Sequence, residues 1–323
     1  MCISENTHLH ASLVSDVEGI CRSNREKAAL QYSIIIPHKD IPDLLQRCLD
    51  SIPLRDDVQV IVVDDNSDPK KVDFDHFPRW KGKRYEYYLT KEGKGAGYAR
   101  NVGLDHAKGR WVVFADADDF FADGFNALLD EMVDAKEDLI FFDYINVCSD
   151  DITQHVNERM WFSNSMKSYR EGTKNEKRFR TSIPVAWCRL VKRELLEKEH
   201  IRFSETRWSN DVFFSAQVNC MAKKFQVNST VGYVLTQRTD SLTDRVCGTS
   251  QELIVRLQEG LKGERLYAQH GLYAKGTLTS PHLRTAHKKK GFWWCLRFAV
   301  TNVFNWPIAR LMFAYLYKRT MKK

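Results

Sequence analysis

Short, continuous apolar segments alternate with stretches of helical periodicity in the first part of the chain. Residues 32–37 and 58–63 are apolar runs of β-strand length, and residues 43–52 between them place apolar side chains at helical spacing. The pattern continues with expected strands at 84–90 and 110–115 and an expected helix at 96–107. Strands that are apolar on both faces are typical of parallel sheets covered by helices. The sequence therefore predicts an α/β fold with helices on both faces of its sheet.

The composition fits a globular protein with an anionic partner. The chain has 323 residues, of which 43% are hydrophobic, and this is enough for one large α/β domain with additions or for two domains. The net charge of +7 leaves a nucleotide, nucleic acid and an anionic membrane open as partners. Dispersed cysteines without a C-x-x-C pair indicate neither a zinc site nor a disulfide scaffold, so a reducing cytoplasm fits. No signal pattern or uninterrupted apolar run of about 18 residues occurs, and we expect neither secretion nor membrane insertion.

The expected strand at 110–115 leads directly into an acidic cluster made of Asp116, Asp118 and Asp119. Crowded carboxylates repel each other and raise one another's pKa, and a hard cation relieves that repulsion. A divalent metal, Mg²⁺ or Mn²⁺, shared with a diphosphate is the first hypothesis for this site. The alternative is an acidic turn whose side chains cap the next helix.

Two further loops point to a nucleotide. The pair Asp64-Asp65 directly follows the expected strand at 58–63, where a carboxylate can accept hydrogen bonds from a uracil imide or from ribose hydroxyls, and Asp65 is the better candidate of the two. Turn formation is the alternative role for this residue. Residues 91–101 combine small residues that open a helix with the positive charges of Lys94 and Arg100, and this combination suits phosphate. The stretch lacks both the full G-x-G-x-x-G of dinucleotide folds and the Gly-Lys-Ser/Thr of a P-loop.

Four motifs follow one another in the first half of the chain. They are the strand ending at Pro37, V-V-D-D-N-S-D at 62–68, G-x-G-x-A-R-N-x-G-L at 95–104 and F-A-D-A-D-D at 114–119. In this order and at this spacing they resemble the family 2 glycosyltransferases, which have the GT-A fold, a Rossmann-like nucleotide-sugar-transferase sheet. The likeness is specific over about 31–125 and extends more weakly to about 245.

The resemblance implies a nucleotide-sugar donor, usually a UDP-sugar, a divalent metal, and transfer with inversion at the anomeric carbon. Carried over by position, Asp65 would read the base, Arg100 would help to hold the nucleotide, and Asp116 would lie near the ribose and the metal. The expected nucleotide-sugar-binding residues are Pro37, Asp65, Lys94, Arg100 and Asp116. The expected metal ligands are Asp116 and Asp118.

The resemblance also implies residues on the acceptor side. Asp211 matches the position of the catalytic base, which takes the proton of the acceptor hydroxyl, although a helix N-cap is the alternative. Asn210 stands where family members commonly have a glutamate that contacts the acceptor, and an asparagine there keeps a polar side chain but not the charge. Trp187 matches an aromatic residue often placed beside the acceptor, and a tryptophan of the core is the alternative. Acceptor-binding roles are therefore expected for Trp187 and Asn210.

The chain is expected to divide into three parts. These are an N-terminal extension at 1–30, the GT-A domain at 31–245, and a helical C-terminal region at 246–323. Within the domain, 31–125 is the nucleotide-sugar and metal half and 126–245 is the acceptor half. The C-terminal region is basic around 284–290 and aromatic and apolar over 291–306, which is typical of a helix lying in a membrane interface. The alternative is a helical pair packed on the domain.

These observations predict an inverting, metal-dependent hexosyl- or N-acetylhexosaminyl-transferase. We expect it to act in the cytoplasm, peripherally on the inner face of the cell membrane if the C-terminal region binds anionic lipid, and to modify a glycan or lipid-linked acceptor during surface polysaccharide biosynthesis. A nucleotidyltransferase with the same nucleotide site and a catalytically idle sugar-nucleotide-binding partner protein are the alternatives. Nucleic acid is not an expected partner, because the basic residues are not interleaved with a recognisable binding module.

Overall fold

The computed structural model describes residues 30–76, 82, 84–156, 160–237, 249–272 and 278–302. The strands are β1 (Tyr32–His38), β2 (Val58–Asp64), β3 (Tyr85–Leu89), β4 (Trp111–Phe114), β5 (Phe120–Phe121), β6 (Leu139–Cys148), β7 (Arg189–Lys192) and β8 (Phe225–Gln237). The helices are α2 (Pro42–Asp50), α3 (Ala96–His106), α4 (Gly124–Met132), α5 (Trp161–Arg170), α6 (Glu176–Arg180), α7 (Arg193–Lys198), α8 (Asn210–Met221), α9 (Ser250–Gln269) and α10 (Ser280–Asn302). The predicted extension at 1–30 lies almost entirely outside the described residues, as does the end of the C-terminal region.

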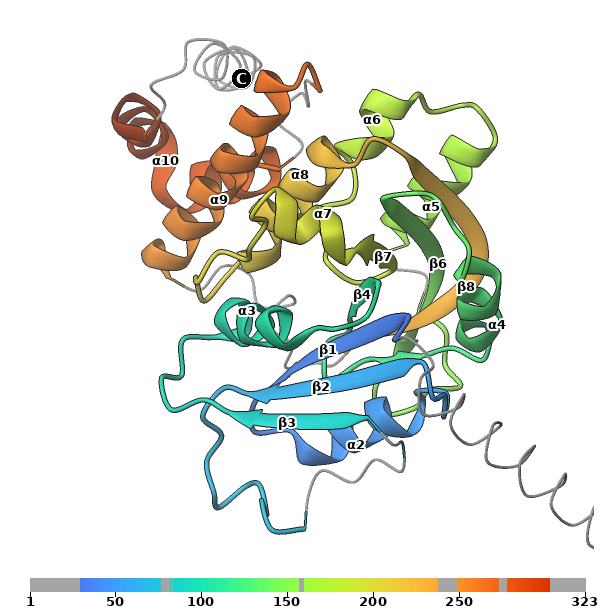
Figure 1. The fold of residues 1–323 in the computed structure, drawn as a ribbon. Coiled ribbons are helices and arrows are strands. Elements are labelled where there is room, and N and C mark those ends of the chain that lie inside the picture. Colours follow the sequence, from blue (N-terminus) through green and yellow to red (C-terminus); the bar gives the residue numbers. More distant parts are fainter. Residues whose placement is uncertain are drawn as a thin grey trace, which may run out of the picture.

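The described strands form one sheet in the order β3-β2-β1-β4-β7-β6-β8-β5, with α2 and α3 on opposite sides of it (Figure 1). β3, β2, β1 and β4 run parallel, which confirms the prediction from the continuous apolar runs. β7 runs antiparallel to both β4 and β6, and β5 runs antiparallel to β8. The sheet is therefore parallel in its first half and mixed in its second. The predicted α/β class is confirmed.

The register of the parallel strands brings their carboxyl ends to a common edge. His38 lies opposite Asp64, and Ile35 lies opposite Phe114, so β1, β2 and β4 end close together. Ligands of open α/β sheets bind beyond this edge, because loops and helix N-termini converge there. Asp65 and the acidic cluster that follows β4 both leave the sheet at this edge.

Helix α3 packs closely on two sides, and glycines make this possible. A Cβ atom on Gly103 would lie 2.4 Å from Cγ2 of Ile35 in β1. A Cβ atom on Gly97 would lie 2.2 Å from the carbonyl oxygen of Ser204. Helix α3 therefore packs on the sheet through Gly103 and on the loop that precedes α8 through Gly97.

One hydrophobic core extends across both halves of the sheet. Phe114 of β4 makes edge contacts with Phe203 and with Phe214 of α8, at ring-centroid distances of 4.9 and 5.3 Å. Phe203 and Phe214 stack on each other at 3.9 Å. Such aromatic packing stabilises beyond its buried area, and here it joins strand β4 to helix α8, which carries Asp211.

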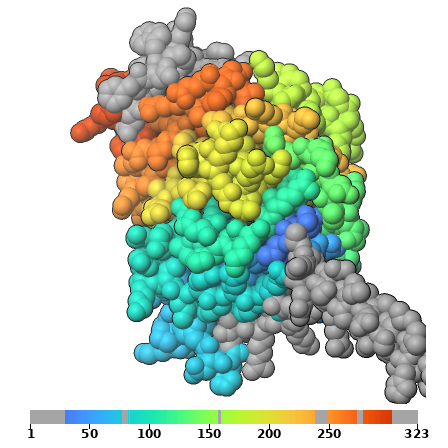
Figure 2. Space-filling view, in the orientation of Figure 1, coloured from blue at the N-terminus to red at the C-terminus, as the bar shows by residue number. Residues whose placement is uncertain are grey.

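Helices α9 and α10 pack against the outside of this domain. Figure 2 shows the orange segment of α9 lying against the yellow segment that leads into α8, and α8 and α9 are in direct contact. Leu253, Leu257 and Leu283 belong to a separate small core between α9 and α10. Gly291, with a φ of 82°, breaks α10 into two helical pieces. None of the described helices is both long enough and apolar enough to span a membrane.

Candidate active site

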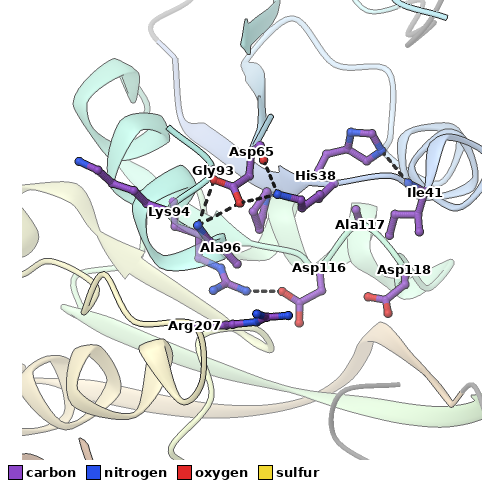
Figure 3. Close-up of a pocket in the computed structure, with 14 residues that line it drawn as sticks. His38, Ile41, Asp65, Gly93, Lys94, Ala96, Asp116, Ala117, Asp118 and Arg207 are labelled. Carbon is purple, nitrogen blue, oxygen red and sulfur yellow. Dashed lines mark hydrogen bonds and ion pairs between the residues drawn. The ribbon is translucent and has the colours of Figure 1, made fainter. Parts of the chain in front are cut away.

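A cavity of about 590 Å³ opens at the carboxyl edge of β1, β2 and β4 (Figure 3). It is lined by Pro37, His38, Lys39, Ile41, Asp65, Gly93, Lys94, Gly95, Ala96, Arg100, Asp116, Ala117, Asp118 and Arg207. All residues predicted to bind the nucleotide-sugar and the metal are in this set. The predicted acceptor-side residues Trp187, Asn210 and Asp211 are not.

Asp65 is held in place by the glycine turn that precedes α3. The backbone N–H of Gly95 donates to both carboxylate oxygens of Asp65, at 3.0 and 2.9 Å. Gly95 has a φ of 96°, which a residue with a side chain rarely adopts. The ammonium group of Lys39 lies 3.6 Å from the same carboxylate. The carboxylate that is predicted to read the base is therefore pre-oriented from two sides.

The neighbouring Asp64 has a structural role. It pairs with Nδ1 of His38 at 2.7 Å and accepts hydrogen bonds from the backbone and hydroxyl of Ser67 at 2.8 and 2.7 Å. Burial alone would raise the pKa of Asp64, but the hydrogen bonds from His38 and Ser67 outweigh burial and lower this pKa. Asp64 and His38 thus tie the ends of β2 and β1 together, and Asp65 faces the cavity.

Arg100 connects the acidic loop after β4 to the start of α8. One of its terminal nitrogens donates to Oδ1 of Asp116 at 2.5 Å, and the other donates to Oδ1 of Asn210 at 2.7 Å. The guanidinium also lies over the ring of Phe203, 5.2 Å from its centroid. Arg100 is only 7% exposed, so this charge is balanced inside the protein rather than by solvent.

The acidic loop after β4 is anchored from behind by β8. The hydroxyl of Tyr233 accepts a hydrogen bond from the backbone N–H of Asp116 at 3.0 Å and donates to Asp119 at 2.9 Å. The backbone N–H of Thr236 donates to the other oxygen of Asp119 at 2.7 Å, and its hydroxyl donates to the carbonyl oxygen of Asp118 at 2.6 Å. Asp119 therefore points into the core, whereas the side chains of Asp116 and Asp118 line the cavity.

The carboxylates of this loop do repel each other. Burial first, and then the charges of Asp118 and Asp116, raise the pKa of Asp119 well above its usual value. No cluster of three or more His, Cys, Asp or Glu side chains suited to a metal occurs in the described part of the chain. Two carboxylates on a cavity nevertheless fit Mg²⁺ or Mn²⁺, because such ions complete their coordination with phosphate oxygens and water. Asp116 and Asp118 would hold such an ion.

Asp211 lies in the first turn of α8, directly after Asn210. Ser209 is the N-cap of this helix, so Asp211 does not occupy the capping position. Ser209 has a φ of 54°, an uncommon conformation for a residue with a side chain. Burial raises the pKa of Asp211, while the charge of Arg100 opposes the shift and Asp116 adds to it. This environment favours a carboxyl group that takes up a proton more readily than an ordinary aspartate.

Trp187 packs in the core rather than on the cavity wall. It is 7% exposed and stacks on Tyr233 at a ring-centroid distance of 5.4 Å. Tyr144 and Phe162 contact it edge-on at 4.8 and 6.0 Å. This packing favours the core alternative for Trp187, and its contact with an acceptor stays a prediction.

The motifs did not point to Arg207, to Lys39 as a partner of Asp65, or to Tyr233. Arg207 comes from the loop before α8, where no motif marks a ligand residue. Tyr233 lies within β8 and belongs to none of the four motifs. Both reach the site through contacts between segments that are distant in the sequence, so local patterns carry no signal for them.

The match to a protein family agrees with this geometry. The sequence profile described as Glycosyl transferase family 2 matches residues 33–199, more than half of the chain. The chain belongs to glycosyl transferase family 2. Among curated relatives, the uncharacterized glycosyltransferase EpsJ of Bacillus subtilis (strain 168) is 25% identical over 66% of this chain and 62% of that protein. The poly(ribitol-phosphate) beta-glucosyltransferase of Bacillus spizizenii (strain W23) is 34% identical over 31% of this chain and 16% of that protein.

Solved structures confirm the predicted GT-A glycosyltransferase fold. S. aureus TarS 1-349 in complex with UDP-GlcNAc superposes with a TM-score of 0.55 at 17% identity, over 83% of this chain and 76% of that one. The mannosyltransferase PcManGT from Pyrobaculum calidifontis, in complex with GDP-Man and Mn²⁺, gives a TM-score of 0.50 at 18% identity, over 92% and 87% of the two chains. At these identities the likeness is one of fold.

Proposed function

We propose that this protein transfers a sugar from a nucleotide-sugar, most simply a UDP-sugar, to a glycan or lipid-linked acceptor in surface polysaccharide biosynthesis. The cavity that gathers Asp65, Lys94, Arg100 and Asp116 at one sheet edge carries the proposal, since it offers a base-reading carboxylate and phosphate-binding cations together. Structures of the same fold hold UDP-GlcNAc, or GDP-Man with Mn²⁺. The sequence relatives with named pathways include a poly(ribitol-phosphate) glucosyltransferase, and this supports a role in surface-polymer assembly.

The proposed mechanism is a direct displacement that inverts the anomeric carbon. Asp211 would accept the proton of the acceptor hydroxyl, and its environment, which raises its pKa, suits a base. Arg100 bonds Asp116 and Asn210 at once, and thereby fixes the donor side relative to the start of the helix that carries Asp211. Bound at Asp116 and Asp118, Mn²⁺ or Mg²⁺ would stabilise negative charge on the leaving diphosphate.

The proposal is tested by nucleotide release from a panel of UDP-, GDP- and dTDP-sugars with Mn²⁺, with Mg²⁺ and with EDTA. We expect metal-dependent release from one donor, and its loss in Asp118→Asn. The matched control is Asp134→Asn, an exposed carboxylate outside the cavity. Full activity of Asp118→Asn would remove the acidic loop from the mechanism. Release of pyrophosphate instead of a nucleoside diphosphate would indicate nucleotidyl transfer.

We also propose that helix α10 of the C-terminal region contacts the anionic inner face of the cell membrane. Trp293 and Val300 are 77% and 65% exposed on α10. The exposed Lys288 and Lys290 precede them, and an exposed tryptophan next to lysines suits a lipid interface. Sedimentation with phosphatidylglycerol vesicles should fall for Trp293→Ala. Equal sedimentation with neutral phosphatidylcholine vesicles would contradict the electrostatic part of the proposal.

A further inference from the structure

Two of the four cations that line the cavity are already paired inside the protein. Lys39 donates to the carbonyl oxygen of Asp65 at 2.9 Å and lies near the carboxylate of the same residue. Arg100 donates to Asp116 and Asn210. These two positive charges therefore offset carboxylates and polar groups of the protein itself.

The other two cations, Lys94 and Arg207, form no ion pair among the residues that the structure describes. The ammonium group of Lys94 lies 4.6 Å from the ring centroid of Tyr98, and the guanidinium of Arg207 lies 5.4 Å from that of Trp208. A cation that rests on an aromatic face keeps its N–H groups available for a ligand. Lys94 and Arg207 thus line the cavity, one from each half of the domain, without an ion pair in the described part of the chain. The charge of Lys94 acts on nearby Glu92, and Figure 3 shows the end of its side chain directed away from Asp65 and Asp116, so Arg207 is the cation better placed for a ligand.

The loop that carries Arg207 lies against the glycine turn at the start of α3 and is hydrogen-bonded to the start of α8. A Cβ atom on Gly95 would lie 3.8 Å from the carbonyl oxygen of Thr206 and 3.9 Å from Cα of Arg207. The hydroxyl of Thr206 donates to the carbonyl oxygen of Trp208 at 3.0 Å, and its own carbonyl accepts from the amide of Asn210 at 3.3 Å. Figure 3 shows Arg207 entering the cavity from the side opposite Asp65.

We propose that Arg207 binds the diphosphate of the nucleotide-sugar donor and of the nucleoside diphosphate product, on the side of the cavity opposite Asp65. This inference rests on the proposed function and adds a residue of the acceptor half to the donor site. The cavity suits a diphosphate because of the two groups on either side of it. Asp65, proposed to read the base, lies on one side, and the acidic loop proposed to bind the metal lies on the other. The planar guanidinium can donate two parallel hydrogen bonds to phosphate oxygens, which an ammonium group cannot do.

The position of Arg207 also links donor binding to the proposed base. Arg207 lies on the same short loop as Ser209, directly before Asn210 and Asp211. A diphosphate bound to Arg207 would therefore also set the position of the start of α8, and with it Asp211, relative to the donor.

The test measures nucleotide binding by isothermal titration calorimetry in the presence of Mn²⁺. The ligands are uridine, UMP and UDP. If the unaltered chain prefers guanine nucleotides, guanosine, GMP and GDP replace them, and the expectations for UDP and uridine apply to GDP and guanosine. Arg207→Gln should weaken UDP binding about 10- to 100-fold and leave uridine binding within about 2-fold, since only the charge-assisted phosphate bonds are lost. Arg207→Lys should give an intermediate loss. The control is Arg202→Gln on the same loop, where an exposed arginine pairs with Asp105 at 3.2 Å.

The outcomes separate this inference from the proposed function. Normal UDP binding by Arg207→Gln would overturn the assignment, whether or not transfer to an acceptor then falls. An equal loss for uridine and UDP would also overturn it, because that pattern indicates a disturbed base site. If the unaltered chain binds neither nucleoside diphosphate, the proposed function falls together with this inference. Thermal unfolding of the variants checks that the fold is retained, as expected for an exposed side chain.

Discussion

The hydroxyl of Tyr233 donates a hydrogen bond to Oδ2 of Asp119 at 2.9 Å, although the two residues are 114 positions apart in the chain. The same hydroxyl accepts from the backbone N–H of Asp116. One side chain of β8 thus holds the acidic loop at two points. The ring of Tyr233 is in turn stacked on Trp187, which connects the core of the acceptor half to the loop that is proposed to bind metal.

Tyr233→Phe tests this connection. The variant keeps the stacked ring and leaves the buried carboxyl of Asp119 with one donor fewer. We expect the free energy of unfolding to fall by about 1–3 kcal/mol, and the apparent Mn²⁺ affinity in the presence of nucleotide to fall as the loop shifts. Urea unfolding and Mn²⁺ titration measure the two effects. Tyr169→Phe on α5 is the control, and an unchanged Mn²⁺ affinity for Tyr233→Phe would show that the loop is fixed without this bond.

Trp187→Ala separates packing from acceptor binding. Because Trp187 is buried among aromatic residues, its truncation should destabilise the protein by about 3–5 kcal/mol. Trp161→Ala, at a 68% exposed tryptophan, should change stability little. If Trp187→Ala instead keeps its stability and raises only the KM for the acceptor, the stacking role predicted from the family holds.

Asp211→Asn should keep nucleotide binding and lower the transfer rate by about 10²- to 10⁴-fold, because the acceptor proton then has no base. The pH dependence of kcat/KM gives a second measurement. A base acts when deprotonated, so a pKa that burial raises should move the acid limb of the profile to higher pH than an ordinary aspartate would give. A variant that transfers sugar at the normal rate would leave Asp211 without a catalytic role.

His282 of α10 predicts acid sensitivity of the C-terminal helices. Burial and the nearby charge of Arg256 lower the pKa of His282 to about 4, and Glu252 opposes them. Between pH 6.5 and 4 the unfolded chain therefore binds the proton and the folded chain does not, so stability falls as the pH drops through this window. The loss is at most about 3 kcal/mol. His282→Gln should flatten this dependence in urea unfolding at pH 7 and pH 5, whereas the exposed His270→Gln should not.

The parts of the site that motifs revealed are those made by short segments. The strands at 32–37 and 58–63 and the helix at 96–107 follow from local periodicity, and the structure reproduces them within a residue or two. Asp65 and Asp116 directly follow strands. Their meeting in one cavity follows from the rule that parallel strands share a carboxyl edge.

Sequence alone determined the α/β fold, the strand-end loops and the residue types that suit a nucleotide-sugar, because these depend on spacing within a few residues. Tertiary structure alone decided that Arg100 joins Asp116 to Asn210, that Trp187 supports Tyr233 rather than lining the cavity, and that Arg207 enters the cavity. Such contacts join residues many tens of positions apart, and their partners are chosen by packing of the whole domain. Local sequence patterns do not specify these partners, because many side chains in the chain have suitable chemistry. Which of them meet depends on how the sheet and α8 pack together.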